Sequence, residues 1–230
     1  RTLTVIVPRD GRAMAAVLGR DTVEGADQIA AVTTGELDRS AAPGAGDAPS
    51  TADRIVVNPK AFGTFSATER RIVLTHEATH VAVRASSRSD TPVWLEEGFA
   101  DYVAYADSGL SRDSIASALL SKIRSGWQLR HLPNEAEFDP AQGDVGPAYA
   151  AAWLALDRIA AGHGRDAVVR FTRIANGLDP YGQPESGSPG TAEAAGETPL
   201  ARAFALVTGQ DQAAFEAGWI EAVTQAARGS

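Results

Sequence analysis

The strongest constraint on the fold of this chain comes from two histidines four residues apart, His76 and His80, with Glu77 directly after the first. Residues at this spacing lie on one face of an α-helix, so both imidazoles can bind one metal ion if the segment is helical. Glu77 lies one step round the helix, where its carboxylate can face a metal-bound water without binding the metal. The pattern therefore predicts a helix that carries a metal site and a general base. The alternative is a helix with two histidines on its inner face, both satisfied by hydrogen bonds.

The elements predicted around this helix change from strands to helices along the chain. Ser66 and Glu69 match a capping box, which predicts that the motif helix begins there and runs to about Arg84. Segments rich in β-branched residues predict strands at 3–7, 29–34 and 54–58. Further helices are predicted at 12–18, 91–106, 111–125, 147–161, 164–175, 198–209 and 210–227, and loop-like segments at 40–52 and 178–196.

This order of elements indicates an α+β fold, with a small N-terminal mixed sheet and the motif helix followed by a mainly helical C-terminal lobe. We expect a single domain over residues 1–230, with approximate lobes at 1–90 and 91–230. The strand at 54–58 is expected at an edge of the sheet, where it could pair with an extended peptide.

The composition limits both the metal ligands and the partners. The 230 residues include no cysteine, so a metal site must use histidine and carboxylate ligands. The net charge of −8 argues against a nucleic acid partner, since binding to phosphates requires a basic surface. The longest apolar stretch, at 148–156, is too short to span a bilayer. We therefore expect no transmembrane segment in this chain. We also expect the protein to be a monomer.

A catalytic zinc site needs a third protein ligand, and the residues after the motif limit the choice. A metzincin would have glycine at position 83 and histidine at 86, where this chain has Val83 and Ser86, so that class is excluded. The next candidate is a carboxylate on the following helix, in the segment WLEEGFADY at 94–102. Together, HEATH and PVWLEEGFADY resemble the gluzincin metallopeptidases, most closely the aminopeptidase-like branch with its WLxEGxA pattern.

The resemblance covers about residues 54–160 and implies a zincin-like fold. It also implies that zinc is bound by His76, His80 and Glu97, the last being the glutamate directly before the glycine. Glu96 is the alternative ligand, although it points about 100° away round the helix. The glycine-rich motif with which aminopeptidases bind the substrate N-terminus is not evident, so the resemblance leaves open whether cleavage is exo or endo.

Two further residues match the family pattern outside the ligand set. Asp101 follows Glu97 by one helical turn, and an acid at this offset commonly supports a zinc-binding imidazole by accepting its second N–H. Tyr149 stands at the start of an apolar helix, where the family has a tyrosine whose hydroxyl stabilises the oxyanion. The alternative for Tyr149 is a core or boundary tyrosine.

These residues predict zinc-dependent hydrolysis of a peptide or protein substrate, with one Zn²⁺ per chain and Glu77 as the general base. One alternative is a catalytically inactive domain of the same fold that binds a peptide or a cell-envelope partner. Another is a structural zinc domain, in which Glu77 would have no role.

The residue usage also suggests a source. Lys60 and Lys122 are the only lysines beside many arginines, and alanine and glycine are frequent, which is typical of a GC-rich bacterium. Because the chain begins at Arg1 rather than at methionine, we expect either a trimmed piece of a longer chain or a processed product, from which a leader or anchor could have been removed. An extracellular or cell-envelope location is therefore expected, with the cytoplasm as the alternative.

Overall fold

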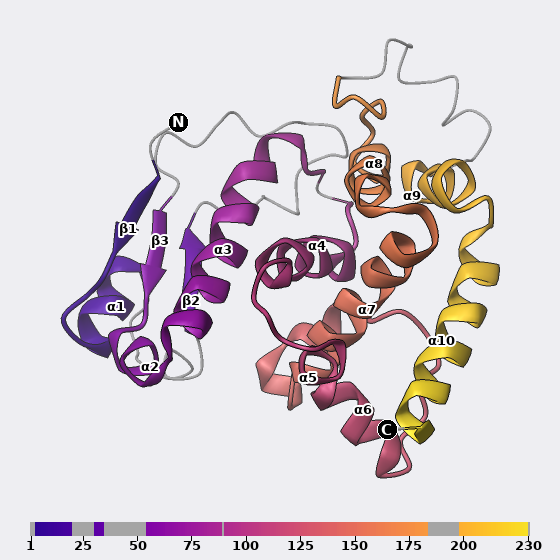
Figure 1. Cartoon of the computed structure of the whole chain (residues 1–230). Helices are drawn as coiled ribbons and strands as arrows, with labels where there is room; N and C mark the ends of the chain where they lie inside the picture. Colours follow the sequence, from indigo (N-terminus) through magenta and orange to yellow (C-terminus); the bar gives the residue numbers. More distant parts are fainter. Residues whose placement is uncertain (1–2, 20–29, 35–53, 89, 184–197, 230) are drawn as a thin grey trace. The chain divides into compact units, whose positions relative to one another are not determined.

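The computed structural model describes residues 3–19, 30–34, 54–88, 90–183 and 198–229 (Figure 1). The chain divides into two compact units: unit 1 comprises residues 1–89 and 103–109, and unit 2 comprises residues 90–102 and 110–230. The described part is α+β and mostly helical, with a small three-stranded mixed sheet, which confirms this part of the prediction. The segment 40–52 and most of 178–196, both predicted as loops, lie outside the described residues.

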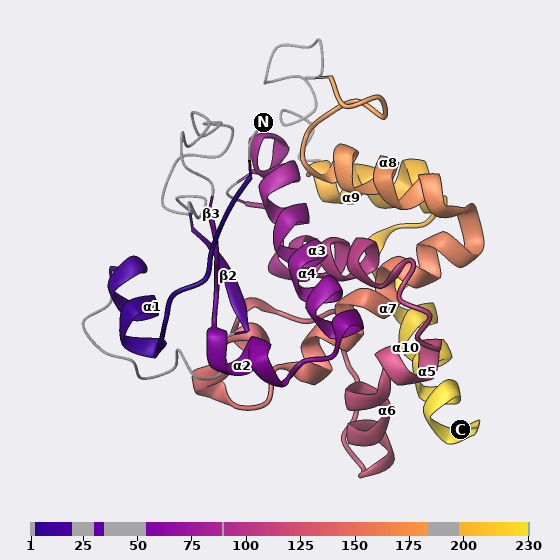
Figure 2. The same ribbon diagram turned by 60° about the vertical axis from the view of Figure 1, so that its left-hand side comes forward.

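Unit 1 is built on the sheet, whose strand order is β1-β3-β2, with β1 parallel and β2 antiparallel to β3 (Figure 1). Figure 2 shows α3 beside β2 and β3. Its elements are β1 (Thr4–Ile6), α1 (Gly11–Val17), β2 (Ala31–Thr34), β3 (Arg54–Val57), α2 (Pro59–Thr64), α3 (Ala67–Val83) and the short helical turn η2 (Arg84–Ser86).

The expectation that segment 54–58 forms an edge strand was wrong, because β3 is the central strand. Ile55, Val56 and Val57 are all buried. Successive side chains of a strand point to opposite faces, so three buried residues in a row require cover on both faces. α3 packs against β2 and β3, where Val73 and Leu74 join the cluster around Ile55 and Val57, and α1 also contacts β3.

Unit 2 is helical and has its core around α7. α4 begins in unit 2, and its last residues, 103–105, are grouped with unit 1. The elements are α4 (Val93–Tyr105), α5 (Arg112–Ile115), α6 (Ser117–Arg124), η3 (Glu135–Phe138), η4 (Pro140–Gln142), α7 (Gly146–His163), α8 (Arg165–Ala175), α9 (Pro199–Ala203), η6 (Phe204–Thr208) and α10 (Gln212–Gly229).

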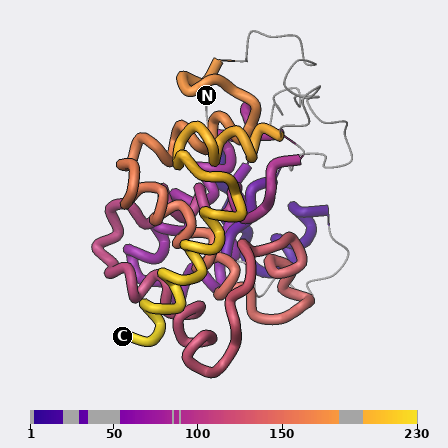
Figure 3. Tube along the Cα trace, turned by 90° about the vertical axis from the view of Figure 1, so that its right-hand side faces the viewer, coloured from indigo at the N-terminus to yellow at the C-terminus, as the bar shows by residue number. Residues whose placement is uncertain are grey.

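Aromatic side chains from four elements fill the core of unit 2. The ring of Phe204 lies 4.9 Å from that of Phe171, 5.0 Å from Phe215 and 6.4 Å from Trp94, measured between centroids. Figure 3 shows α8 beside α9, with α10 running from there to the C-terminal end. Rings that are buried and in mutual contact supply much of the hydrophobic stabilisation of such a helical unit.

Two of the helices differ from the sequence prediction in detail. The helix predicted at 111–125 is divided at Ala116 into α5 and α6, and the second half of the helix at 198–209 is the π-helical turn η6. The apolar stretch at 148–156 lies within α7 and is almost entirely buried. Within the described ranges, every helix is too short or too polar to cross a membrane.

Candidate metal site

The helix that carries the histidine pair is specified by its own N-terminus. Ser66 Oγ accepts a hydrogen bond from the backbone N–H of Glu69, and the Glu69 carboxylate accepts one from the backbone N–H of Ser66. This reciprocal pair satisfies two backbone donors that the first turn of a helix leaves without partners. The predicted capping box is therefore confirmed, and α3 runs to Val83, one residue short of the predicted end.

His76 and His80 present adjacent ring nitrogens on one face of α3. Their Nε2 atoms lie 3.0 Å apart, and the rings meet edge to face with centroids 4.7 Å apart. Two nitrogens bound to one tetrahedral zinc, each about 2.0–2.1 Å from the ion, would be about 3.3 Å apart. The pair is thus close to the geometry of two ligands, and it needs only a small change in the side chains to share one ion.

Glu77, directly after the first histidine, is buried and hydrogen-bonded to strand β2. Its side chain is 9% exposed, and its Oε2 accepts a hydrogen bond of 2.7 Å from Oγ1 of Thr33 on β2. A buried carboxylate with one fixed oxygen is a suitable proton acceptor, because its orientation does not depend on solvent. Thr33 could not be identified from the sequence, since nothing in a short strand indicates that one hydroxyl reaches a helix 44 positions away.

Glu97 lies on α4, in unit 2. It is half-buried, between the fully buried Leu95 and the buried Gly98. A Cβ at position 98 would lie 2.8 Å from the backbone oxygen of Ala152, so the glycine is what allows α4 to approach α7 this closely. The position of Glu97 therefore depends on helix packing within unit 2.

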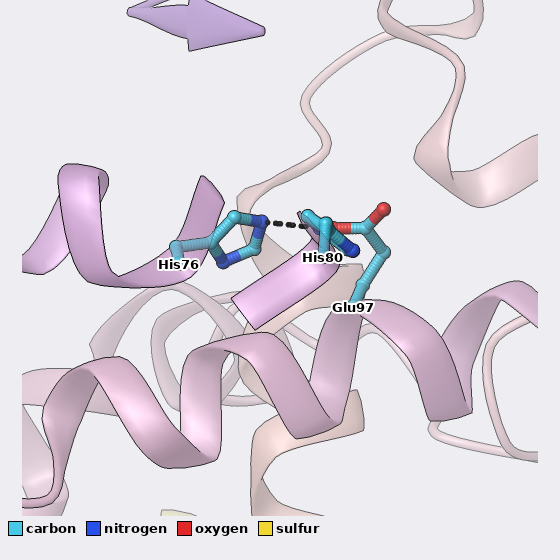
Figure 4. Close-up of side chains that lie close together, drawn as sticks. All are labelled: His76, His80 and Glu97. Atoms are coloured by element: carbon cyan, nitrogen blue, oxygen red, sulfur yellow. Dashed lines mark hydrogen bonds between the residues drawn. The ribbon is translucent and has the colours of Figure 1, made fainter. Parts of the chain in front are cut away.

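The three predicted ligands form a set that could hold a metal ion. One ligand atom from each of His76, His80 and Glu97 lies within 4.8 Å of the others (Figure 4). Two imidazole nitrogens and a carboxylate oxygen match the donor set of catalytic zinc sites with two histidines and one glutamate.

The other predicted residues also lie on helices of unit 2. Asp101 is 8% exposed on α4, one turn after Glu97, and a buried carboxylate at this depth requires hydrogen-bond or charge partners. Next to it, burial raises the pKa of Tyr102, and the nearby Arg165 opposes that rise, so the Tyr102 hydroxyl keeps its proton at neutral pH. Glu96 is half-buried on the same helix.

Tyr149 lies in the first turns of α7, as expected for a tyrosine at the start of an apolar helix. It is half-buried, and its ring meets that of Phe138 edge to face with centroids 5.2 Å apart. This ring contact is compatible with both interpretations of Tyr149, as a boundary residue and as the tyrosine whose hydroxyl stabilises the oxyanion.

Unit 2 also contains a hollow that is separate from the predicted site residues. Its volume is about 740 Å³, and it lies between α6, the η3–η4 segment and the start of α7. The lining includes Trp127, His131, Asp144 and Ala148, but none of the residues predicted to bind metal or to take part in catalysis. The chemistry of the metal site therefore rests on the donor set described above and not on this hollow.

No protein-family model matches the chain, and neither a characterised protein nor a solved structure shows significant similarity to it.

Proposed function

We propose that this chain is a zinc metallopeptidase of the gluzincin type with a zincin-like fold. The observation that supports the proposal most strongly is the combination of a convergent histidine pair with a buried glutamate directly after the first histidine. A structural zinc site needs no general base, so the buried carboxylate of Glu77 favours catalysis over a structural role.

In this proposal His76, His80 and Glu97 hold one Zn²⁺, and Asp101 fixes an imidazole by accepting its second N–H. The metal, when bound, supplies a Lewis acid that polarises the scissile carbonyl and makes water more acidic. Glu77 takes the proton from the attacking water and passes it to the leaving amine. Tyr149 donates a hydrogen bond to the oxyanion as negative charge develops on it.

The proposed substrate is a peptide or protein, and the net charge of −8 disfavours nucleic acid. We further propose that the enzyme is a monomer and that it acts outside the cytoplasm, in the extracellular space or cell envelope of a GC-rich bacterium. Cleavage specificity would then be determined by the residues that contact the substrate on either side of the scissile bond.

The test combines metal content with peptide cleavage. Elemental analysis of the zinc-incubated protein should find about one zinc per chain, and His76→Ala should lose it, because one of three protein ligands is removed. A quenched fluorescent peptide library should be cleaved, and a chelator should stop the cleavage. Glu77→Gln should keep its zinc but lose activity by a factor of about 10² to 10⁴, as for a missing general base.

Glu69→Gln is the matched control, since it replaces an exposed acid of the same helix by an amide. It should keep both zinc and activity. Full activity in the Glu77→Gln variant would refute the role of Glu77. A zinc-loaded wild-type protein that cleaves no library peptide would instead support a catalytically inactive binding domain.

A further inference from the structure

The hydroxyl of Thr33 is bonded to the glutamate that is proposed as the general base. Thr33 Oγ1 lies 2.7 Å from Oε2 of Glu77 and 3.2 Å from the backbone oxygen of the same residue. The shorter of the two distances is a normal O–H···O hydrogen-bond length, so the carboxylate is the main acceptor of this hydroxyl. Thr33 is 7% exposed and Glu77 9%, and water therefore competes little for this hydrogen bond.

The strand holds this hydroxyl in a fixed place. Thr33 pairs with Ile55 in the antiparallel register of β2 and β3. The end of β2 is also tied to the end of α3, because Arg84 Nη1 donates a hydrogen bond of 3.2 Å to the backbone oxygen of Thr34. A β-branched side chain has few χ1 rotamers, so Thr33 presents its hydroxyl to α3 with little freedom.

A glutamate side chain rotates about three bonds, and a base that takes a proton from water must keep one orientation. We propose that Thr33 is a positioning residue for Glu77. It engages Oε2, so that Oε1 is the oxygen that receives the proton. This inference rests on the proposed function, and it assigns to β2 the part of orienting the general base.

The competing explanation is purely structural: the hydroxyl would only satisfy buried polar groups where β2 meets α3. A structural role would lower stability without changing the turnover of the folded, zinc-loaded enzyme. A positioning role would lower kcat while KM and zinc content stay the same. The two explanations are therefore separated by rate constants expressed per zinc-loaded chain.

Three variants of Thr33 test the two explanations. Thr33→Val keeps the shape and removes the hydroxyl, Thr33→Ala removes the hydroxyl and the side-chain bulk, and Thr33→Ser keeps the hydroxyl alone. Thr33→Val and Thr33→Ala should each lower kcat by about 10- to 100-fold, whereas Thr33→Ser should recover most of the activity. Thr34→Val, which removes the neighbouring hydroxyl that donates to the Arg54 backbone oxygen at 3.4 Å, should cleave like the wild type.

A double-mutant cycle adds a criterion that does not depend on the size of the effect. In the Glu77→Gln background, Thr33→Val should cause no further loss, whereas two independent effects would multiply. The inference is overturned if zinc-loaded Thr33→Val and Thr33→Ala cleave peptides like the wild type while Glu77→Gln does not. A wild-type enzyme that binds zinc but cleaves nothing overturns the proposed function and this inference together.

Discussion

Unit 1 and unit 2 differ in how they hold the residues proposed for catalysis. In unit 1 the histidine pair and Glu77 lie on one helix, whose start is fixed by a local capping box and whose core contacts are a small aliphatic cluster. In unit 2, Glu97 lies on a helix placed by distant contacts, with Gly98 against α7 and Trp94 in the aromatic core. The first arrangement depends mainly on local sequence, and the second depends on tertiary packing.

The difference indicates that a loss of packing should affect the ligand set unequally. Damage to the core of unit 2 should displace Glu97 and leave two histidines that still bind zinc weakly. Damage to α3 should displace both histidines, and zinc binding should then be lost. Residue-level hydrogen exchange can test this, because it reports the stability of each unit separately.

The largest effect is expected from Phe171→Ala in the aromatic core of unit 2. Phe171 is fully buried, and removing such a ring costs about 3–5 kcal/mol of unfolding free energy. Amides of α7 and α8 should lose protection from hydrogen exchange, while those of α3 keep theirs. Val169→Ala, at an exposed position of the same helix, should change stability by about 0.5 kcal/mol or less. Equal loss of protection in α3 would show that the two units unfold together.

Zinc itself gives the next largest effect. At a free zinc concentration 100 times its Kd, a ligand that binds only the folded protein stabilises it by about 2.7 kcal/mol. If Glu97 is a ligand, zinc should raise the protection of α3 and of α4 in the wild type. In Glu97→Gln, at the same multiple of the Kd of that variant, protection should rise in α3 alone. Glu96→Gln should behave as the wild type. If instead Glu97→Gln behaves as the wild type and zinc protects α3 alone in Glu96→Gln, the third ligand is Glu96.

Gly98→Ala tests the helix contact next to Glu97. The added Cβ would lie 2.8 Å from the backbone oxygen and 3.0 Å from the carbonyl carbon of Ala152. Because backbone atoms cannot turn away, α4 and α7 must separate, at a cost of about 1–3 kcal/mol. Zinc affinity should fall with stability, since Glu97 moves with its neighbour. Thermal unfolding and a zinc titration measure the two quantities.

Gly162→Ala is the matched control on α7. A Cβ at Gly162 meets no atom within 4 Å, so the substitution should stabilise the helix by about 0.4–1 kcal/mol. Unchanged zinc affinity in Gly98→Ala, together with a loss of stability, would show that the position of Glu97 does not depend on this contact.

The parts of the fold that the sequence predicted are those with local causes. The capping box at Ser66 and the four-residue spacing of the histidines both act within α3, and the structure has the helix at the predicted place. α2 is absent from the helices predicted from the sequence, and it follows directly after the strand predicted at 54–58. In the structure Pro59 begins a helix, and Asn58 caps it by accepting hydrogen bonds from two backbone N–H groups.

What the sequence did not predict depends on contacts between distant segments. The central position of β3 follows from pairing with β1 and β2, and neither partner can be identified from the four residues of β3. The bond from Thr33 to Glu77 depends on the register of β2 and on how α3 packs against it. Glu97 was identified by a motif resemblance, and no periodicity in the sequence distinguishes it from Glu96.

Ser66→Ala is expected to have the smallest effect, and it tests the local half of the comparison. The side chain of Ser66 caps α3 by accepting from the backbone N–H three residues later, and losing such a cap costs about 1 kcal/mol. Exchange protection should fall in the first turn of α3, about ten residues before the histidines. Zinc affinity should change little, because the histidines lie beyond the fraying turn. Ser66→Asn, which keeps a capping oxygen, should restore the protection.

The pH dependence of this variant separates the cap from a general change in the helix. Hydrogen bonds from the side chain and then from the backbone of Ser66 lower the pKa of Glu69 below its usual 4.5. Because the pKa of Glu69 is lower in the folded state than in the unfolded state, the interaction stabilises the protein at pH values above the unfolded-state pKa. This stabilisation is lost as the pH falls through the folded-state pKa. The difference between wild type and Ser66→Ala should therefore shrink as the pH falls below 4.5. A difference that stays constant there would show that the Glu69 half of the capping box contributes nothing, and that the neutral Ser66 cap alone stabilises the start of α3.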